Sequence, residues 1–137
     1  MEKIKVYISW LGNNYGASFG DNVPGAVVLT AKNNEELLKE IPETLEFHVQ
    51  GMVDDGDDVP EWLRKGDYSF EYHFDTAALL HFSSSCVPLA TLSRVTGINQ
   101  SLLSHYASGL KRPRELQKKR ITDGLHQIGR QLMSINA

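Results

Sequence analysis

The chain has 137 residues, a length that suits one domain or two small ones. Its 41% hydrophobic and 23% charged residues are ordinary for a globular protein, and no apolar run approaches the roughly 20 residues of a membrane span. The first residues lack the cationic and apolar segments of a signal peptide, so we expect none. A single cysteine, Cys86, excludes an internal disulfide and favours a reduced, cytoplasmic setting.

Charge is distributed unevenly along the chain, although the formal net charge is only −3. Residues 1–75 hold 6 Lys and Arg against 15 Asp and Glu, a balance of −9, whereas residues 76–137 hold 8 against 2, a balance of +6. A basic segment of this kind is typical of nucleic-acid binding, and an acidic one would repel DNA and attract a basic partner. The alternative is that the two signs reflect two solvated surfaces without a shared role.

Strands are predicted in the acidic part wherever apolar and polar side chains alternate. These stretches are residues 3–10, 15–19 and 68–74. The short apolar run at 26–30 predicts a further, buried strand that comes third in chain order. A turn is expected at 60–66, with Trp62 and Leu63 covering the core.

A long helix is predicted between the third and fourth strands, ending near Val53. Asn33 or Asn34 would cap its first turn, where acidic residues also favour a helix start. Pro42 is expected to kink this helix or to begin a second segment. The inward-facing positions recur at helical spacing and are Leu38, Ile41, Leu45, His48 or Val49, and Met52.

An acidic loop follows this helix, and its carboxylates belong to Asp54, Asp55, Asp57 and Asp58. Their spacing does not match an EF-hand, and a nuclease site would need carboxylates that converge from separate strands. A solvated loop is the expectation, with no metal site. The five histidines lack zinc-ligand spacing, so a hydrolase site is not expected, and Cys86 is expected to be a small buried side chain.

Residues 87–113 predict two short helices joined by a tight turn. Gly97 ends the first helix and supplies a left-handed backbone position, and Asn99 caps the second helix, which stops at Gly109. Leu89 and Leu92 would face the core from the first helix. A capped second helix with an outward polar face is what a helix-turn-helix requires. The alternative is an ordinary pair of packed helices.

The outward face of this second helix predicts the contacts with DNA. Gln makes bidentate bonds with adenine, and Ser bonds either a base or a phosphate. Cations after the helix would hold the sugar-phosphate backbone. The predicted DNA-binding residues are Asn99, Gln100, Ser101, Ser104, His105, Lys111 and Arg112.

The C-terminal segment carries an apolar seam after a basic stretch, at Ile121, Leu125, Ile128, Leu132 and Ile135. Such a seam packs a helix on a partner. It closes the core of its own domain, pairs with its copy in a dimer, or does both. A dimer would set two recognition helices about 34 Å apart and would require a palindromic operator.

The run GINQSLLSHYASGLKRP (97–113) resembles the Xre-type helix-turn-helix of bacterial repressors in its Gly-Ile, Leu-Ser, Tyr and Gly-x-x-x-Pro framework. Ser93 stands where such repressors often carry alanine. The acidic part resembles the N-terminal domain of HicB-type antitoxins. That resemblance rests on Tyr15-x-Ala17-x-Phe19, Val23-Pro24-Gly25, Glu35-Glu36, residues 46–56 and Val59-Pro60. Ala26, residues 31–34 and Pro42 depart from the family pattern.

The resemblance implies an α+β chain. Its N-terminal domain (1–75) would be a partial RNase H-like β-β-β-α-β fold without nuclease chemistry, and its second (76–137) an all-α helix-turn-helix domain. It also implies a cytoplasmic antitoxin, not an enzyme, that needs no cofactor or metal and no membrane. The antitoxin would neutralise a HicA-like mRNA-cleaving toxin, for which the aspartates at 54–58 are candidate contacts. As a homodimer or a higher homo-oligomer, it would repress its own operon.

Two alternatives remain beside the antitoxin. One is a stand-alone transcriptional repressor whose N-terminal domain senses a small ligand. The other is an RNase H-type enzyme, which would cleave nucleic acid in a magnesium-dependent reaction.

Overall fold

The computed structural model describes all residues 1–137 and divides them into two compact units, Met1–Asp75 and Thr76–Ala137. The fold is mixed α+β, with 50% helix and 18% strand. Each unit encloses its own cluster of buried apolar side chains. None of the helices combines the length and apolar character that a membrane span requires.

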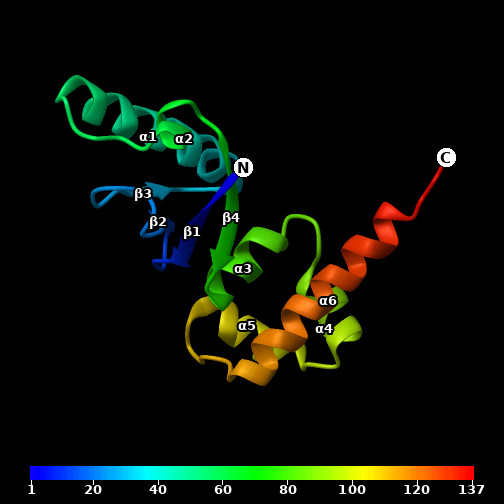
Figure 1. The fold of residues 1–137 in the computed structure, drawn as a ribbon. Helices are drawn as coiled ribbons and strands as arrows, with labels where there is room; N and C mark the ends of the chain where they lie inside the picture. Colours follow the sequence, from blue (N-terminus) through cyan, green and yellow to red (C-terminus); the bar gives the residue numbers. More distant parts are fainter. The chain divides into compact units, whose positions relative to one another are not determined.

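A four-stranded mixed sheet forms the first unit, in the order β3-β2-β1-β4. The strands are β1 (Glu2–Trp10), β2 (Tyr15–Phe19), β3 (Val28–Ala31) and β4 (Tyr68–Phe74). β1 pairs antiparallel with β2 and parallel with β4, so it lies inside the sheet (Figure 1). The strands predicted at 3–10, 15–19 and 68–74 are confirmed within one residue.

The third strand differs from its prediction. It begins at Val28 and not at Ala26, and Val28 is 76% exposed. Only Ala31 is buried, because β3 is the margin of the sheet and its alternate side chains face solvent. The apolar run predicted burial on both faces of the strand, which a strand at the sheet margin does not have.

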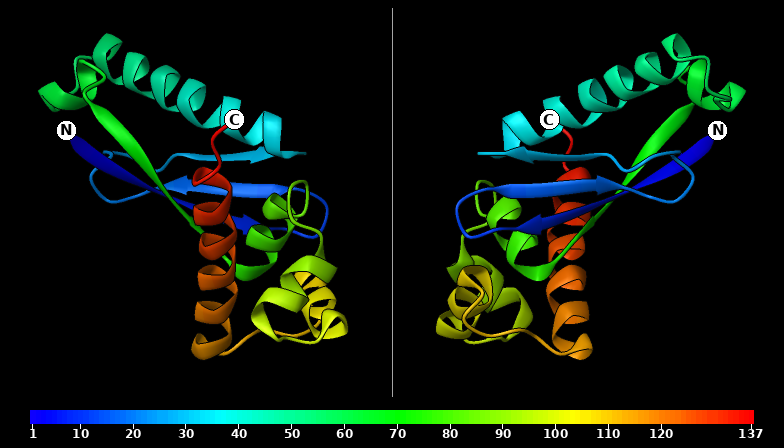
Figure 2. Two further views of the ribbon diagram at one scale, coloured as in Figure 1. Left: turned by 90° about the vertical axis from the view of Figure 1, so that its right-hand side faces the viewer. Right: turned by 90° about the vertical axis from the view of Figure 1, so that its left-hand side faces the viewer.

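Helix α1 (Asn34–Asp54) covers one face of the sheet, and the opposite face carries no helix of this unit (Figure 2). The side chain of Asn33 caps α1 by accepting the N–H of Glu36 at 2.8 Å. The predicted inward position Leu38 is wrong: Leu38 is 42% exposed and Leu37 is fully buried in its place. The buried residues of α1 are Leu37, Ile41, Leu45, Val49 and Met52.

Pro42 does not divide the helix, which is continuous from Asn34 to Asp54. A proline removes one hydrogen bond, here the one that would go to the carbonyl of Leu38. Leu38 lies on the exposed side of α1, where its carbonyl is open to hydration by solvent. The expected break is therefore absent, because the lost bond lies on the solvent side. The predicted turn at 60–66 contains the short helix α2 (Glu61–Arg64), with Leu63 buried.

The second unit consists of four helices around one core. They are α3 (Thr76–Ser83), α4 (Leu89–Thr96), α5 (Gln100–Ser108) and α6 (Glu115–Met133). The core residues are Leu80, Val87, Leu92, Ile98, Leu103, Tyr106 and Ile121. Cys86 was expected to be buried but is exposed, since it lies in the loop between α3 and α4.

Candidate nucleic-acid interface

The turn between α4 and α5 is fixed by side chains on both sides of it. Gly97 ends α4 in the left-handed region with φ of 75°. The hydroxyl of Ser93 donates to the carbonyl of Ile98, and the hydroxyl of Thr96 accepts the Ile98 N–H at 3.2 Å. Ser93 therefore does more than fill a small space, because it binds the last turn of α4 to the chain beyond Gly97.

Helix α6 supports the same turn from behind. The guanidinium of Arg120 donates to the carbonyl of Thr96 at 2.7 Å. Gly124 is buried, and a Cβ at this position would lie 2.7 Å from the Thr96 methyl carbon. The missing side chain of Gly124 thus lets α6 approach α4 closely enough for Arg120 to reach the turn. No sequence pattern predicts this role for Arg120, because it depends on how α6 packs against α4.

Helix α5 begins at a capped end directly after this turn. The side chain of Asn99 accepts the N–H of Ser101 at 2.8 Å, and Gly109 ends the helix with φ of 80°. Leu103 and Tyr106 are buried in the core, whereas Leu102 is half-buried. These contacts fix the side of α5 that faces outward.

The outward side of α5 is polar. Gln100, Ser101 and Ser104 are exposed, as the sequence predicts, and His105 is half-buried. Asn99 is also exposed, but its carbonyl oxygen is engaged in the cap, so only its amide N–H groups face a partner. The face therefore offers both donors and acceptors, the groups needed to bond base edges.

Two cations that form no ion pair follow this face. Lys111 and Arg112 are exposed, and neither forms an ion pair. The acidic residues of this unit are paired on α6 instead: Lys118 with Glu115 at 3.1 Å, and Lys119 with Asp123 at 2.7 Å. The hydrogen bond from Lys119 lowers the pKa of Asp123 below its ordinary value.

The apolar seam of α6 divides into two parts. Ile121 is fully buried in the core of its own unit, and Leu125 and Ile128 pack partly against that core. Leu132 and Ile135 are 62% and 67% exposed. Ile135 lies beyond the end of α6 at Met133, so the predicted helical seam is shorter than expected. Only its C-terminal part is left for a second copy.

The acidic loop of the first unit lies directly at the end of α1. Asp54, Asp55, Asp57 and Asp58 are all exposed, and none forms an ion pair. Gly56 turns the chain with φ of 76°, and the N–H of Asp57 donates to the carbonyl of Met52 at 2.9 Å. The last turn of α1 has no basic residue, so these carboxylates crowd the negative end of the helix dipole.

Three of the five histidines contact a hydrogen-bonding partner through the side chain. His48 contacts the carbonyl of Pro24 at 2.7 Å, His81 contacts that of Ala107 at 2.9 Å, and the imidazole of His73 donates to the carboxylate of Glu71 at 2.6 Å. Nowhere in residues 1–137 do three His, Cys, Asp or Glu side chains come together as a metal-binding group. The aspartates at 54–58 do not form such a group either.

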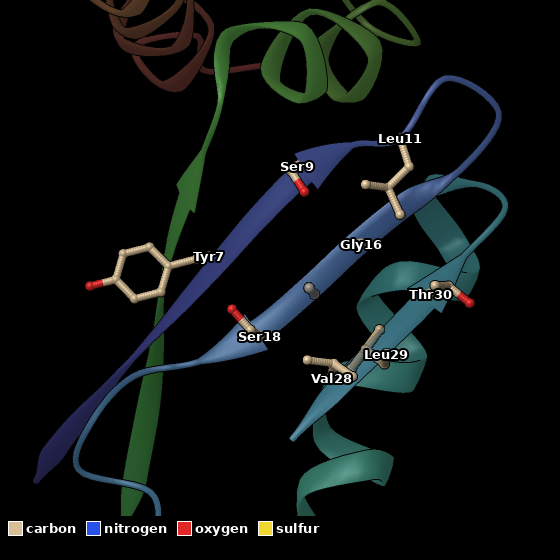
Figure 3. Close-up of a pocket in the computed structure, with 9 residues that line it drawn as sticks. Tyr7, Ser9, Leu11, Gly16, Ser18, Val28, Leu29 and Thr30 are labelled. Atoms are coloured by element: carbon tan, nitrogen blue, oxygen red, sulfur yellow. The ribbon is translucent and has the colours of Figure 1, made fainter. Parts of the chain in front are cut away.

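The sheet face opposite α1 contains a hollow of about 510 Å³ (Figure 3). Tyr7, Ser18 and Val28 lie in one row across its strands, and Ser9, Gly16 and Thr30 lie in the next. Leu11 leans over Gly16, where a Cβ would lie 2.9 Å from its Cδ1. No pattern in the sequence pointed to this hollow, because it depends on strand register and on the missing side chain at position 16.

Comparison of the chain with protein-family models, with curated proteins and with solved structures finds no match in any of the three.

Proposed function

We propose that the chain is an antitoxin with two binding surfaces, one for its operator DNA and one for a HicA-like, mRNA-cleaving toxin. In this proposal the second unit is an Xre-type helix-turn-helix domain, and the first is a partial RNase H-like domain. Three strands, the long helix α1 and the short helix α2 precede β4, and this order, together with the sheet order β3-β2-β1-β4, supports the assignment of the first unit. A repressor acts where its operon lies, so the proposal places the chain in the cytoplasm.

The observation that carries the proposal is the outward face of α5. Its polar residues Gln100, Ser101 and Ser104 are exposed, as are Lys111 and Arg112 after the helix, and the two cations form no ion pair. Base-reading donors and acceptors next to phosphate-binding cations are the combination that sequence-specific DNA binding requires. Asn99 and His105 stay as candidate contacts at the border of this face.

A dimer follows from the same proposal, because palindromic operators are read by two-fold symmetric proteins. The exposed end of the α6 seam, with Leu132 and Met133 at 62% and 88% exposure, supplies apolar surface for a second copy. Leu125 and Ile128 would extend that surface where they are not covered by their own core. Higher homo-oligomers remain open.

The acidic loop supports the toxin-binding half of the proposal. Four exposed carboxylates at the negative end of a helix repel one another and the dipole. A small basic protein bound there would relieve this repulsion, and local conflicts of this kind are expected at functional sites. The contacts would come from Asp54, Asp55, Asp57 and Asp58.

Co-purification tests the proposal. The tagged chain is expressed with its neighbouring small reading frame, and the retained protein is identified and expressed alone. We expect stoichiometric retention of a small basic protein that is toxic by itself, and a gel shift of the operon's own promoter by the tagged chain. Failure of both measurements would contradict the proposal.

The stand-alone repressor is the second candidate, and the hollow beside Tyr7 favours it. The hollow has about 510 Å³, within the size range of small-molecule sites. It runs along the sheet face between β1, β2 and β3 (Figure 3). A chain that shifts its promoter DNA but retains no protein partner would support this candidate over the antitoxin.

A further inference from the structure

β4 forms an unusual margin of the sheet. The strand order ends at β4, so β1 is the only strand beside it. Natural sheets protect such edges with short strands, prolines, lysines or bulges. β3, at the other margin, has 4 residues, whereas β4 has 7 with the sequence YSFEYHF and contains no Pro, Gly or Lys. β4 is therefore a long edge without these features, and its one acidic side chain, Glu71, lies 2.6 Å from His73 of the same strand.

Alternate residues of β4 direct their backbone N–H and C=O groups away from β1. The N–H of Asp75 donates to the carbonyl of Ile8 at 2.8 Å, so the odd-numbered residues direct their backbone groups toward β1. Phe70 and Tyr72, which alternate with them, direct theirs outward. Tyr72 is also 39% exposed. Tyr72 thus presents both a backbone donor and an acceptor beyond the sheet.

The side chains of β4 form a self-complementary pattern. Residues 70–74 are Phe70, Glu71, Tyr72, His73 and Phe74, which alternate aromatic with acid or base. When the direction of this segment is reversed about Tyr72, aromatic residues still occupy the same positions, and Glu71 and His73 exchange places. An antiparallel copy centred on Tyr72 would therefore place aromatic rings opposite aromatic rings and Glu71 opposite His73.

Both faces of β4 suit this arrangement. On one face the rings of Phe70 and Tyr72 are already stacked along the strand, with centroids 6.3 Å apart. On the other face Glu71 and His73 lie 2.6 Å apart, so a second copy would complete a square of alternating acid and base. A register centred on Glu71 would oppose two carboxylates, and one centred on Phe70 would place Glu71 opposite Ser69 and not opposite His73.

We propose that β4 pairs antiparallel with β4 of a second copy of this chain, with the two-fold axis at Tyr72. The two sheets then continue into one another across the pair. This contact uses no residue of α5, α6 or the acidic loop, so it is independent of the proposed binding to DNA and toxin.

Disulfide trapping tests the contact at its centre. Tyr72→Cys is made in full-length chain carrying Cys86→Ser, which removes the exposed native thiol. Directly opposed residues of a hydrogen-bonded antiparallel pair have Cα atoms about 5.5 Å apart, within the range that a disulfide spans. We expect mild oxidation to convert most chains into a covalent dimer, which is read on a non-reducing gel.

Phe70→Cys in the same background is the matched control. In the proposed register the two copies of position 70 lie about 14 Å apart, beyond the reach of a disulfide. The yield at position 72 should exceed that at position 70 by about tenfold, with unchanged tryptophan fluorescence and circular dichroism in both variants. Equal yields, no dimer at position 72, or a crosslink to a co-expressed partner in place of a copy would overturn the proposal.

A charge exchange tests the register by the same crosslink. Glu71→Lys, added to Tyr72→Cys, places a cation opposite His73 of the other copy and should lower the yield. Adding His73→Glu as well restores an opposite-charge pair in both copies and should return the yield to its original value. A crosslink yield that stays the same in both variants would contradict the pairing of Glu71 with His73.

Discussion

The two units differ in the predominant sign of the charged side chains that remain outside ion pairs. In Thr76–Ala137 both acidic residues, Glu115 and Asp123, are paired with lysines on α6, which leaves Lys111 and Arg112 available to a partner. In Met1–Asp75 the acidic residues outnumber the cations, and the aspartates after α1 have no ion pair. A partner therefore meets the charge that remains after internal pairing, which includes Lys111 and Arg112 in the second unit and the four aspartates at 54–58 in the first.

The largest expected effect concerns the support that α6 gives to α4 and to the turn after it. Gly124→Ala should destabilise the second unit by about 1–3 kcal/mol, because its Cβ would collide with Thr96, whose hydroxyl is held in the turn. Gly129→Ala is the matched control: nothing lies within 4 Å of its Cβ, so it should stabilise α6 by up to about 1 kcal/mol.

The two units can be followed separately in this experiment. Both tryptophans, Trp10 and Trp62, belong to the first unit, so their fluorescence reports only on that unit. Gly124→Ala should lower the midpoint of the circular-dichroism transition and leave the fluorescence transition unchanged. A shift of both transitions would show that the two units unfold together.

The next effect separates base reading from phosphate binding. Gln100→Ala should weaken binding to the preferred operator by about 1–3 kcal/mol and relax its base choice. Lys111→Ala should weaken binding to all sequences alike and reduce the slope of log K against log salt by about 1. Titrations at several salt concentrations check both, and an unchanged sequence preference in Gln100→Ala would place the recognition face elsewhere.

A smaller effect is expected at the acidic loop. Asp55→Lys puts a cation at the negative end of α1 and should stabilise the first unit by about 0.3–1 kcal/mol. The same variant should retain less of the basic partner. Asp21→Lys makes the same charge change in an exposed loop outside α1, and should change both stability and retention less than Asp55→Lys does.

The smallest effect concerns pH, with one carboxyl in each unit. A hydrogen bond from His73 lowers the pKa of Glu71, and one from Lys119 lowers the pKa of Asp123. Each bond contributes stability above the unfolded pKa of about 4, and the contribution is lost as pH falls through the lowered folded value. Denaturation is measured between pH 3 and pH 6. As the pH falls, the free energy of unfolding should decrease less steeply than in the wild type, for Glu71→Gln when followed by fluorescence and for Asp123→Asn when followed by circular dichroism.

Periodicity and capping residues predict most of the elements, because they depend on local sequence. Asn33, Gly97 and Asn99 act where the sequence places them. The errors at Leu38, Pro42 and Val28 arise where the outcome depends on which side of an element meets the sheet. The exposed groups of α5 follow from helical spacing, whereas the roles of Arg120 and Gly124 depend on the packing of α6, which no local pattern contains.

The parallel pairing of β1 with β4 has a consequence for synthesis on the ribosome. β1 is an inner strand, yet one of its neighbours, Tyr68–Phe74, is made only after α1 and α2. Until those residues emerge, the nascent chain holds a hairpin of β1 and β2 with an open side on Ile4 and Val6, and it cannot complete its core. Folding of the first unit is therefore delayed to a late point in its translation, and a ribosome that stalls before Tyr68 holds a chain with an exposed inner strand.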